Sequence, residues 1–274
     1  MKPIIKWVGG KSQLLNELNA RKPEQFNNYF ELFVGGGAFA LNLNKDKTTI
    51  SDLNEELINM YQCIRDNVDE VIEIINQFKV LYNENPEKFY YELRNLDKDE
   101  NFIQNNTNNF RAARKIFLNK TCFNGLYRVN SKNQFNVPWN QNQNTPGVYD
   151  EKNLIEVSSF LKKINIKNQN YKDSLKDIKK GDFVYLDPPY DKVKKDTFVD
   201  YTKDNFGEKE QEELADFAKL INNKNAYFMI SNHNTPLINE LYKDFKIEIV
   251  HARRNVNSKG NNRGIVEEVI ITNY

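Results

Sequence analysis

Four consecutive residues, Asp187-Pro188-Pro189-Tyr190, carry the groups needed for chemistry on a planar amine. They follow the apolar, β-prone run Phe183–Leu186, which predicts a buried strand. Two successive prolines end that strand, because neither ring can donate to a strand ladder. The carboxylate and the Pro188 carbonyl can then accept the two hydrogens of an exocyclic amine, while Tyr190 stacks on the ring. Such a corner would present an amino nitrogen to an electrophile.

A glycine-rich turn forms a second candidate site. Phe33 ends a predicted strand that begins at Tyr29, and Gly35-Gly36-Gly37 follows before a predicted helix over 38–43. Glycines at this point let the backbone approach a ligand closely. Asp52 stands 17 positions after Gly35, at the end of a short predicted strand, where its carboxylate suits the two hydroxyls of a ribose. The turn and the acid together indicate an adenosine-containing cofactor, and they leave both NAD and S-adenosylmethionine open.

A third glycine-containing run, Gly9-Gly10-Lys11-Ser12, resembles the end of a phosphate-binding P-loop. That motif requires another glycine five positions before Gly10, where this sequence has Ile5. Nucleotide hydrolysis is therefore not predicted. Trp7, just before this run, would by itself be assigned to core packing.

Composition excludes several classes of protein. The chain has 274 residues, 28% of them charged and 39% hydrophobic, and a net charge of +1, which fits one large α/β domain or a core domain with an insertion. Two cysteines and two histidines (His233 and His251) are too few for a zinc cluster or a disulfide framework. No apolar run has the length of a signal region or a membrane span. We expect a cytoplasmic, metal-free protein that does not enter membranes.

Basic residues are concentrated in two stretches. Residues 102–149 contain no aspartate or glutamate, and a second acid-free window separates Glu248 from Glu267. Two such windows in a nearly neutral chain predict one positive face, with chance clustering on solvated surface as the alternative. The side chains expected to contact phosphates in the first window are Arg111, Arg114, Lys120 and Lys132.

Residues 121–139 interleave aromatic and turn residues with these charges and predict a loop or hairpin. A hairpin would present Arg128 for bidentate contact with guanine, and Leu126 or Pro138 for apolar contact with a thymine methyl. Two aromatic side chains would be able to stack on bases or wedge between them, Phe123 and Tyr127. The alternative is an ordinary exposed loop with a buried aromatic residue.

Strand, glycine turn, helix, strand and acid, in this order, begin a doubly wound sheet. The strand over 183–186 belongs to the same sheet, although about 130 residues separate it from Asp52. We therefore expect the middle of the chain to be an insertion that carries recognition. Further patterns predict helices over 14–18, 71–82, 89–93, 110–118, 208–221 and 236–242, and strands over 226–231, 247–251 and 266–272.

In these motifs the chain resembles the Dam-type DNA adenine N6-methyltransferases (D12 class, alpha-group), bacterial and phage enzymes that modify GATC. The resemblance spans Lys6 to Tyr274. Its matching stretches are residues 6–11, 31–38, 51–54, 123–132, 135–138, 187–190 and 230–232. Related N-methyltransferases of RNA and of protein glutamine share corners like that at 187–190, so the hairpin makes the resemblance specific.

The resemblance implies a class I methyltransferase fold, which is an α/β, Rossmann-like doubly wound sheet with an inserted helical and hairpin DNA-recognition domain. Residues 1–61 and 175–274 would form the catalytic domain, and residues 62–174 the target-recognition domain. The implied cofactor is S-adenosylmethionine, with contacts from Trp7, Lys11, Phe33, Gly35, Gly37, Asp52 and Asp187. The implied substrate is double-stranded DNA, contacted by Lys6, Phe123, Asn124, Leu126, Arg128, Asn130, Lys132, Pro138, Arg253 and Arg263.

The expected activity is methyl transfer to N6 of a flipped adenine by a monomeric enzyme without a metal. Its expected catalytic residues are Asp187, Pro188, Pro189 and Tyr190. Three other interpretations stay open at this point. The chain could be an N-methyltransferase of RNA or protein glutamine, an NAD-dependent oxidoreductase, or a DNA-binding module without catalysis.

Overall fold

The computed structural model describes residues 1–141, 149–191, 206–253 and 265–274. Within these residues one sheet contains seven strands in the order β3-β2-β1-β4-β5-β7-β6. Neighbours from β3 to β5 run parallel, whereas β7 is antiparallel to both β5 and β6. The strand bounds are β1 Tyr29–Glu31, β2 Thr48–Asp52, β3 Asn165–Asn168, β4 Phe183–Leu186, β5 Tyr227–His233, β6 Lys246–Arg253 and β7 Ile265–Thr272.

This strand order confirms the predicted doubly wound α/β sheet. From β1 the chain proceeds to β2 and β3 on one side, and it later fills β4 and β5 on the other. β1 and β4 are direct neighbours, with Tyr29 opposite Phe183 and Glu31 opposite Tyr185. Ligands bind such sheets outside the carboxyl ends of the strands, where the strand order reverses. The glycine turn, Asp52 and Asp187 all lie at that edge.

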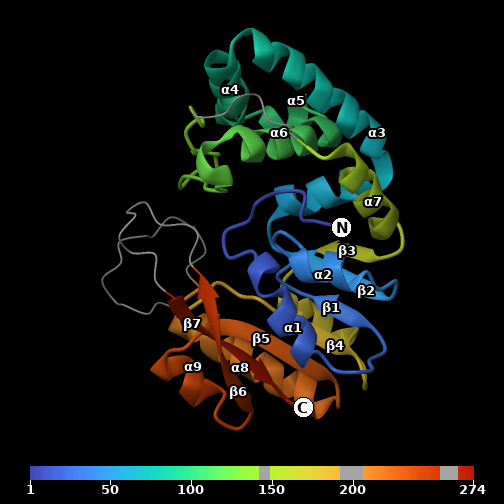
Figure 1. The fold of residues 1–274 in the computed structure, drawn as a ribbon, viewed down its shortest axis with the longest axis vertical. Coiled ribbons are helices and arrows are strands. Elements are labelled where there is room, and N and C mark those ends of the chain that lie inside the picture. The colour runs from blue at the N-terminus through green and yellow to red at the C-terminus, as the bar shows by residue number, and fades with distance from the viewer. Residues whose placement is uncertain (142–148, 192–205, 254–264) are drawn as a thin grey trace.

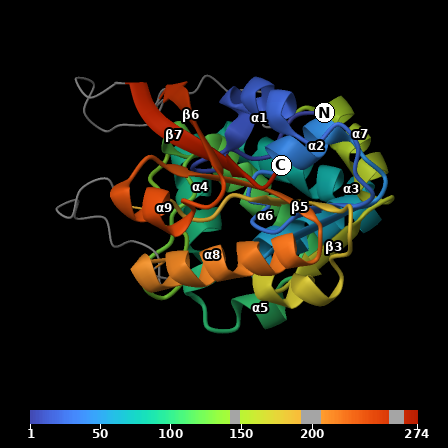
Figure 2. The same cartoon turned by 90° about the horizontal axis from the view of Figure 1, so that it is seen from below.

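Helices cover both faces of the sheet (Figure 2). Tyr29 and Phe183 pack with Phe39 of α2 on one face, and alternate strand residues such as Phe30 pack with Phe217 of α8 on the other. The first face is covered by α1 Leu15–Arg21, α2 Ala38–Leu43 and α7 Glu151–Leu161, the second by α8 Glu208–Asn223 and α9 Pro236–Leu241.

Four more helices stand above the sheet in Figure 1, namely α3 Glu55–Glu84, α4 Pro86–Asn95, α5 Phe102–Asn105 and α6 Asn108–Thr121. The side chain of Asn54 caps α3 by accepting from the Leu57 N–H at 2.9 Å, and the helix loses helical geometry at Asn67 (φ −139°, ψ 43°). α3 packs against β2, β3 and α7 near the sheet and against α6 above it. The helix predicted over 71–82 is therefore one part of a longer element.

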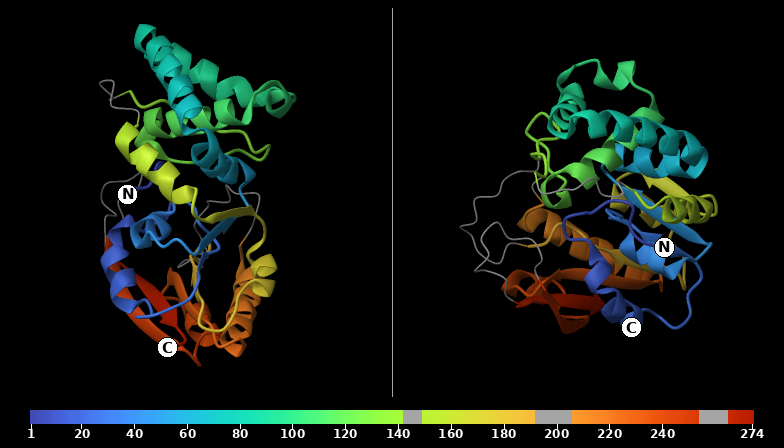
Figure 3. Two further views of the ribbon diagram at one scale, coloured as in Figure 1. Left: turned by 90° about the vertical axis from the view of Figure 1, so that its right-hand side faces the viewer. Right: turned by 45° about the horizontal axis from the view of Figure 1, so that its top comes forward.

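β3 lies within residues 62–174, the range assigned from the sequence to the inserted domain, yet it is the edge strand of the sheet. It pairs in parallel with β2, with Ile50 opposite Ile166. The sequence pattern missed it because only Ile166 of its four residues is buried. The range assigned to the inserted domain therefore includes one strand of the sheet, and Figure 3 shows the helical part above the sheet in two further views.

Asn119 of α6 joins the amino-terminal segment at Lys6 to the start of the 121–139 segment at Gly125. Its buried side-chain oxygen accepts from the Lys6 N–H at 2.8 Å, and its nitrogen donates to the carbonyls of Lys6 (2.9 Å) and Gly125 (3.1 Å). A Cβ on Gly125 would lie 2.6 Å from the Lys6 side chain, so the two segments touch directly. The amino-terminal segment is thus fixed to the helical part before it reaches the sheet edge.

The Asn119→Ala substitution should lower the free energy of unfolding by about 2 kcal/mol, because three backbone groups lose their buried partner. Urea denaturation followed by circular dichroism should show a lower midpoint with an unchanged slope. Asn105→Ala, at an exposed position of α5, is the matched control and should change stability by less than about 0.5 kcal/mol. Equal midpoints for the two variants would contradict the role of Asn119.

Candidate active site

The Asp187 carboxylate lies directly after β4 at the carboxyl edge of the sheet, and its side chain is only 18% exposed. The buried ammonium of Lys11 lies 2.6 Å from its Oδ1 and 4.7 Å from the centre of the Tyr190 ring. The same ammonium donates to the Gly9 carbonyl at 2.6 Å. Lys11 therefore fixes the amino-terminal loop against the corner and compensates the buried negative charge.

Burial raises the pKa of Asp187 to about 6, against the opposing effect of the Lys11 cation. The nearby Glu268 carboxylate raises the pKa further. Asp187 is therefore ionised at neutral pH and able to accept hydrogen bonds through both oxygens. It becomes a neutral acid under mildly acidic conditions.

The two prolines present their carbonyls differently. Gln211 of α8 donates to the Pro189 carbonyl at 2.9 Å, and Asn232 of β5 donates to Gln211 at 3.0 Å. Among the residues that the structure describes, no group donates to the Pro188 carbonyl. The Pro188 carbonyl is the one that the sequence predicts to accept from an amine, and it has no donor among the described residues. No local motif indicates Gln211, because its contact with the Pro189 carbonyl depends on how α8 packs against the sheet.

The glycine turn and Asp52 form the second half of the site. Gly35 N–H donates to one oxygen of Asp52 at 3.1 Å, and Asn54 N–H donates to the other at 3.0 Å. Gly35 and Gly37 adopt positive φ (47° and 67°), which favours glycine, and the Tyr61 hydroxyl donates to the Gly35 carbonyl at 2.9 Å. Burial raises the pKa of Asp52. The carboxylate is held in place while each oxygen keeps lone-pair capacity for a ligand hydroxyl.

Trp7 does more than pack in the core. A Cβ on Gly35 would lie 2.7 Å from its indole, so the ring lies directly on the glycine turn. The ring of Tyr127, from the hairpin, stacks on Trp7 with centroids 4.8 Å apart and planes 21° apart. The ammonium of Lys115, a buried residue of α6 that sequence reasoning did not select, lies 3.9 Å from the centre of the Tyr127 ring. Trp7 thus connects the glycine turn to the predicted recognition segment.

Residues 121–139 form the predicted hairpin. Val129 and Phe135 make an antiparallel bridge, Asn136 N–H donates to the Arg128 carbonyl at 3.1 Å, and the Asn130 side chain closes the tip by accepting from two backbone N–H groups. Exposed side chains on or beside the hairpin include five from the predicted DNA contacts, Phe123, Asn124, Arg128, Lys132 and Pro138.

Three further predicted DNA contacts belong to the same region, namely Leu126, Asn130 and Lys6. Leu126 and Asn130 are half-buried, and the ammonium of exposed Lys6 donates to the Asn124 carbonyl at 3.1 Å. The Arg128 guanidinium donates from Nε to the Asn136 side chain at 2.6 Å. Arg128 is therefore oriented by its own hairpin.

Two predicted phosphate contacts are wrong. Arg111 is buried and paired with Glu56, and Arg114 is buried between the Leu93 and Arg94 carbonyls and the Asp97 carboxylate. Both cations hold α6 within the helical part, so neither reaches the surface. Lys120 is half-buried and burial lowers its pKa, which leaves Lys132 as the exposed basic residue of this set. Arg253 ends β6, and Arg263 lies outside the described residues.

The corner, the glycine turn and the hairpin all lie within a long stretch of the chain that matches one protein family. The family of D12 class N6 adenine-specific DNA methyltransferases matches residues 7–256. The chain belongs to this family. It is 39% identical to the Type II methyltransferase M1.LlaDCHI of Lactococcus lactis subsp. cremoris, over the whole chain and 96% of that protein. It is also 38% identical to the Type II methyltransferase M.MjaIII of Methanocaldococcus jannaschii (100% and 99% covered) and 32% identical to the DNA adenine methylase of Haemophilus influenzae (98% and 92%).

As an adenine-specific DNA methyltransferase, the enzyme is neither an NAD-dependent oxidoreductase nor a DNA-binding module without catalysis. Among the described helices, none combines the length and the apolar character that a membrane span requires. The described residues also contain no group of three or more histidine, cysteine and acidic side chains that could hold a metal ion.

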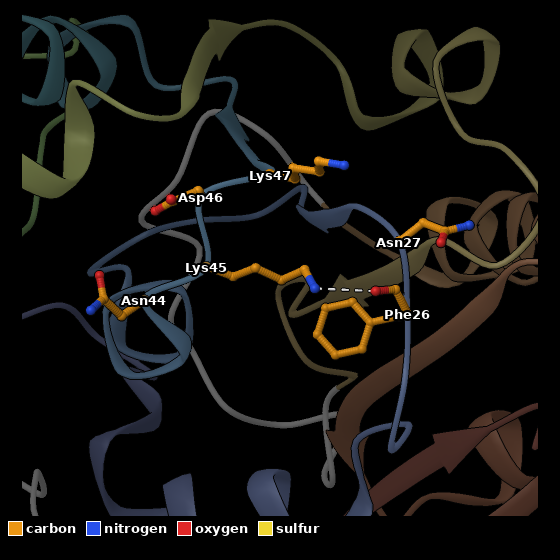
Figure 4. A pocket seen from close by; sticks show the side chains of 6 residues that line it. All are labelled: Phe26, Asn27, Asn44, Lys45, Asp46 and Lys47. Atoms are coloured by element: carbon orange, nitrogen blue, oxygen red, sulfur yellow. Dashed lines mark hydrogen bonds between the residues drawn. The ribbon is translucent and has the colours of Figure 1, made fainter.

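A surface hollow of about 520 Å³ lies away from this chemistry (Figure 4). Its lining residues precede β1 and β2, so it lies at the amino edge of the sheet, opposite Asp187. Lys45 is engaged there, because its ammonium donates to the Phe26 carbonyl at 3.1 Å and lies over the Phe26 ring. The hollow is therefore separate from the candidate active site at the carboxyl edge.

Methyl transfer by the enzyme should decline below about pH 6. The acceptor form of Asp187 is the carboxylate, and its raised pKa of about 6 makes that form scarce at lower pH and dominant above. The measurement is kcat/KM on a short duplex from about pH 5 to about pH 8, which reports groups of the free enzyme. Lys11→Met removes the cation that lowers this pKa, so the acid limb should move to higher pH. An acid limb in the same place would contradict its assignment to Asp187.

Proposed function

We propose that the enzyme transfers the methyl group of S-adenosylmethionine to N6 of an adenine flipped out of double-stranded DNA, within the sequence GATC. The observation that carries this proposal is that two carboxylates, those of Asp52 and Asp187, lie at the same edge of the sheet. Asp52 suits the ribose of the cofactor, and Asp187, two strands away across β1, suits the target amine.

The residues around Asp52 fit an adenosine-containing cofactor. Two backbone N–H groups fix the carboxylate, the glycine turn admits close approach, and Phe33 forms a wall by packing on Tyr171 with ring centroids 5.2 Å apart. Trp7 would line the opposite side from its place on Gly35. Lys11 and Asp187 would meet the charged methionine end. When bound, S-adenosylmethionine would supply an electrophilic methyl group.

The Asp187 corner would activate and orient the amine. The lone pair of adenine N6 is delocalised into the ring, which makes the nitrogen a poor nucleophile. Hydrogen bonds to the Asp187 carboxylate and the Pro188 carbonyl would favour tetrahedral geometry at nitrogen and stabilise the positive charge that develops there. The amine cannot reach this corner from within the duplex, so the base must leave the stack. Tyr190 would then stack on it and fix its plane.

The hairpin would read the DNA around the flipped base. Exposed Arg128 would contact a guanine, with Leu126 and Pro138 beside a thymine methyl, and Lys6 would reach a second guanine. Phe123 is 46% exposed, whereas the Tyr127 ring is occupied by its stack on Trp7, so Phe123 is the better candidate for a wedge between bases. Exposed Lys132 would contact phosphate.

Modification-sensitive long-read sequencing tests the proposal directly. A plasmid would be grown with the wild-type protein, and separately with Asp187→Ala, in a host that lacks adenine methylation. N6-methyladenine confined to GATC is expected with the wild type and none with the variant. Methyladenine at another motif would overturn the GATC assignment, and no methyladenine from folded, S-adenosylmethionine-binding protein would favour an RNA or protein glutamine substrate.

Arg128→Ala should relax sequence choice more than it weakens general DNA affinity. Losing one bidentate base contact should reduce the kcat/KM ratio of GATC to single-base variants by about 10- to 100-fold. Lys132→Ala is the matched control on the same hairpin, and it should weaken all duplexes alike and reduce the salt dependence of binding. Equal losses on cognate and non-cognate DNA for Arg128→Ala would contradict base readout.

A further inference from the structure

Glu268 of β7 reaches the corner from a part of the chain that no motif assigned to the site. The Tyr190 hydroxyl donates to Glu268 Oε2 at 2.8 Å. β7 is separated from β4 by β5, so this contact crosses the sheet edge and links segments 78 residues apart. Glu267, the preceding residue, is exposed and accepts instead from the Asn234 side chain at 2.8 Å.

The Tyr190 ring has few other restraints. His233 packs against it edge to face, with ring centroids 4.8 Å apart, and Lys11 lies over its face. The backbone before Tyr190 is held by the bond from Gln211 to the Pro189 carbonyl, and the backbone after it by the Asn232 side chain, which accepts from Asp191 N–H at 3.0 Å. The bond to Glu268 is the described contact that holds the far end of the side chain.

We propose that Glu268 is a positioning residue for methyl transfer, which holds the Tyr190 ring in the plane against which the target adenine stacks. The inference rests on the proposed function, because it requires a base at the Asp187 corner. A ring free to tilt would let the amine drift from the two acceptors and from the methyl donor. Small displacements of a reacting group cause large losses in rate.

Glu268 also contributes a charge, which separates its two effects. Its carboxylate raises the pKa of Asp187, whereas the Lys11 cation lowers it. Three further groups interact electrostatically with Asp187, namely the Glu31 carboxylate of β1 and the hydroxyls of Tyr185 and Tyr190. The His233 imidazole contacts the Tyr190 ring. Glu268→Gln keeps an oxygen that accepts from Tyr190 and removes the charge, while Glu268→Ala removes both.

The test is a comparison of steady-state kinetics on a GATC duplex for Glu268→Ala, Glu268→Gln, Tyr190→Phe and the double variant Tyr190→Phe with Glu268→Ala. Glu268→Ala should lower kcat by about 10- to 100-fold with little change in the KM for DNA. Tyr190→Phe should give a similar loss, and the double variant no further loss, because both remove the same bond.

Glu268→Gln should restore kcat at neutral pH and shift the acid limb of the pH profile to lower pH. Glu267→Ala is the matched control and should behave as wild type.

Two results would overturn the inference. One is an equal loss from Glu268→Ala in the Tyr190→Phe background, which would show that Glu268 acts on something other than the hydroxyl. The other is a Glu268→Gln variant as impaired as Glu268→Ala with an unmoved acid limb. Failure of the proposed function would be distinguishable, because the wild-type enzyme itself would then leave the duplex unmethylated.

Discussion

The ion pair between Lys11 and Asp187 is the interaction on which the arrangement of the site depends. A carboxylate buried at a sheet edge is unfavourable unless a cation or several donors compensate it. The compensating ammonium is that of Lys11, near the amino terminus, and it lies 2.6 Å from Oδ1 of Asp187. The amino-terminal segment therefore reaches the carboxyl edge of the sheet, where Lys11 meets Asp187. Before it reaches that edge, Lys6 lies beside the hairpin and Trp7 lies on the glycine turn.

The same segment makes the sheet and the helical part a single mechanical unit. Asn119 holds Lys6 from the helical side, and Trp7 is stacked between the glycine turn and Tyr127. One of the two clusters of buried side chains spans both parts, because it includes Tyr29 of the sheet and Phe117 of α6. The distance from the hairpin to the Asp187 corner is thus set by packed contacts and not by a flexible linker. A base read by the hairpin and a base presented to the corner would stand in a fixed relation.

Local sequence patterns predicted much of the fold and half of the site. The strand before Asp187, the glycine turn, Asp52 and the hairpin each depend on a few consecutive residues, and the structure has all of them. β3 was missed because an edge strand with one buried residue has no period to detect. Arg111 and Arg114 were misplaced because charge counts do not show that a helix is enclosed by other helices. Gln211 and Glu268 could not be found at all, since each acts through a contact between distant segments.

At the corner, the four residues of the motif and the residues distant in sequence make different contributions. Four consecutive residues supply the acceptors and the ring, but they do not decide which carbonyl remains available or how the ring is turned. Gln211 occupies the carbonyl of Pro189 and Glu268 occupies the hydroxyl of Tyr190. The surroundings of Asp187 act in the same way. Burial raises its pKa to about 6 against the lowering effect of the Lys11 cation, and Glu268 raises the pKa further. The four residues therefore supply the groups of the corner, and the surrounding sheet and helix set their geometry and the ionisation of Asp187.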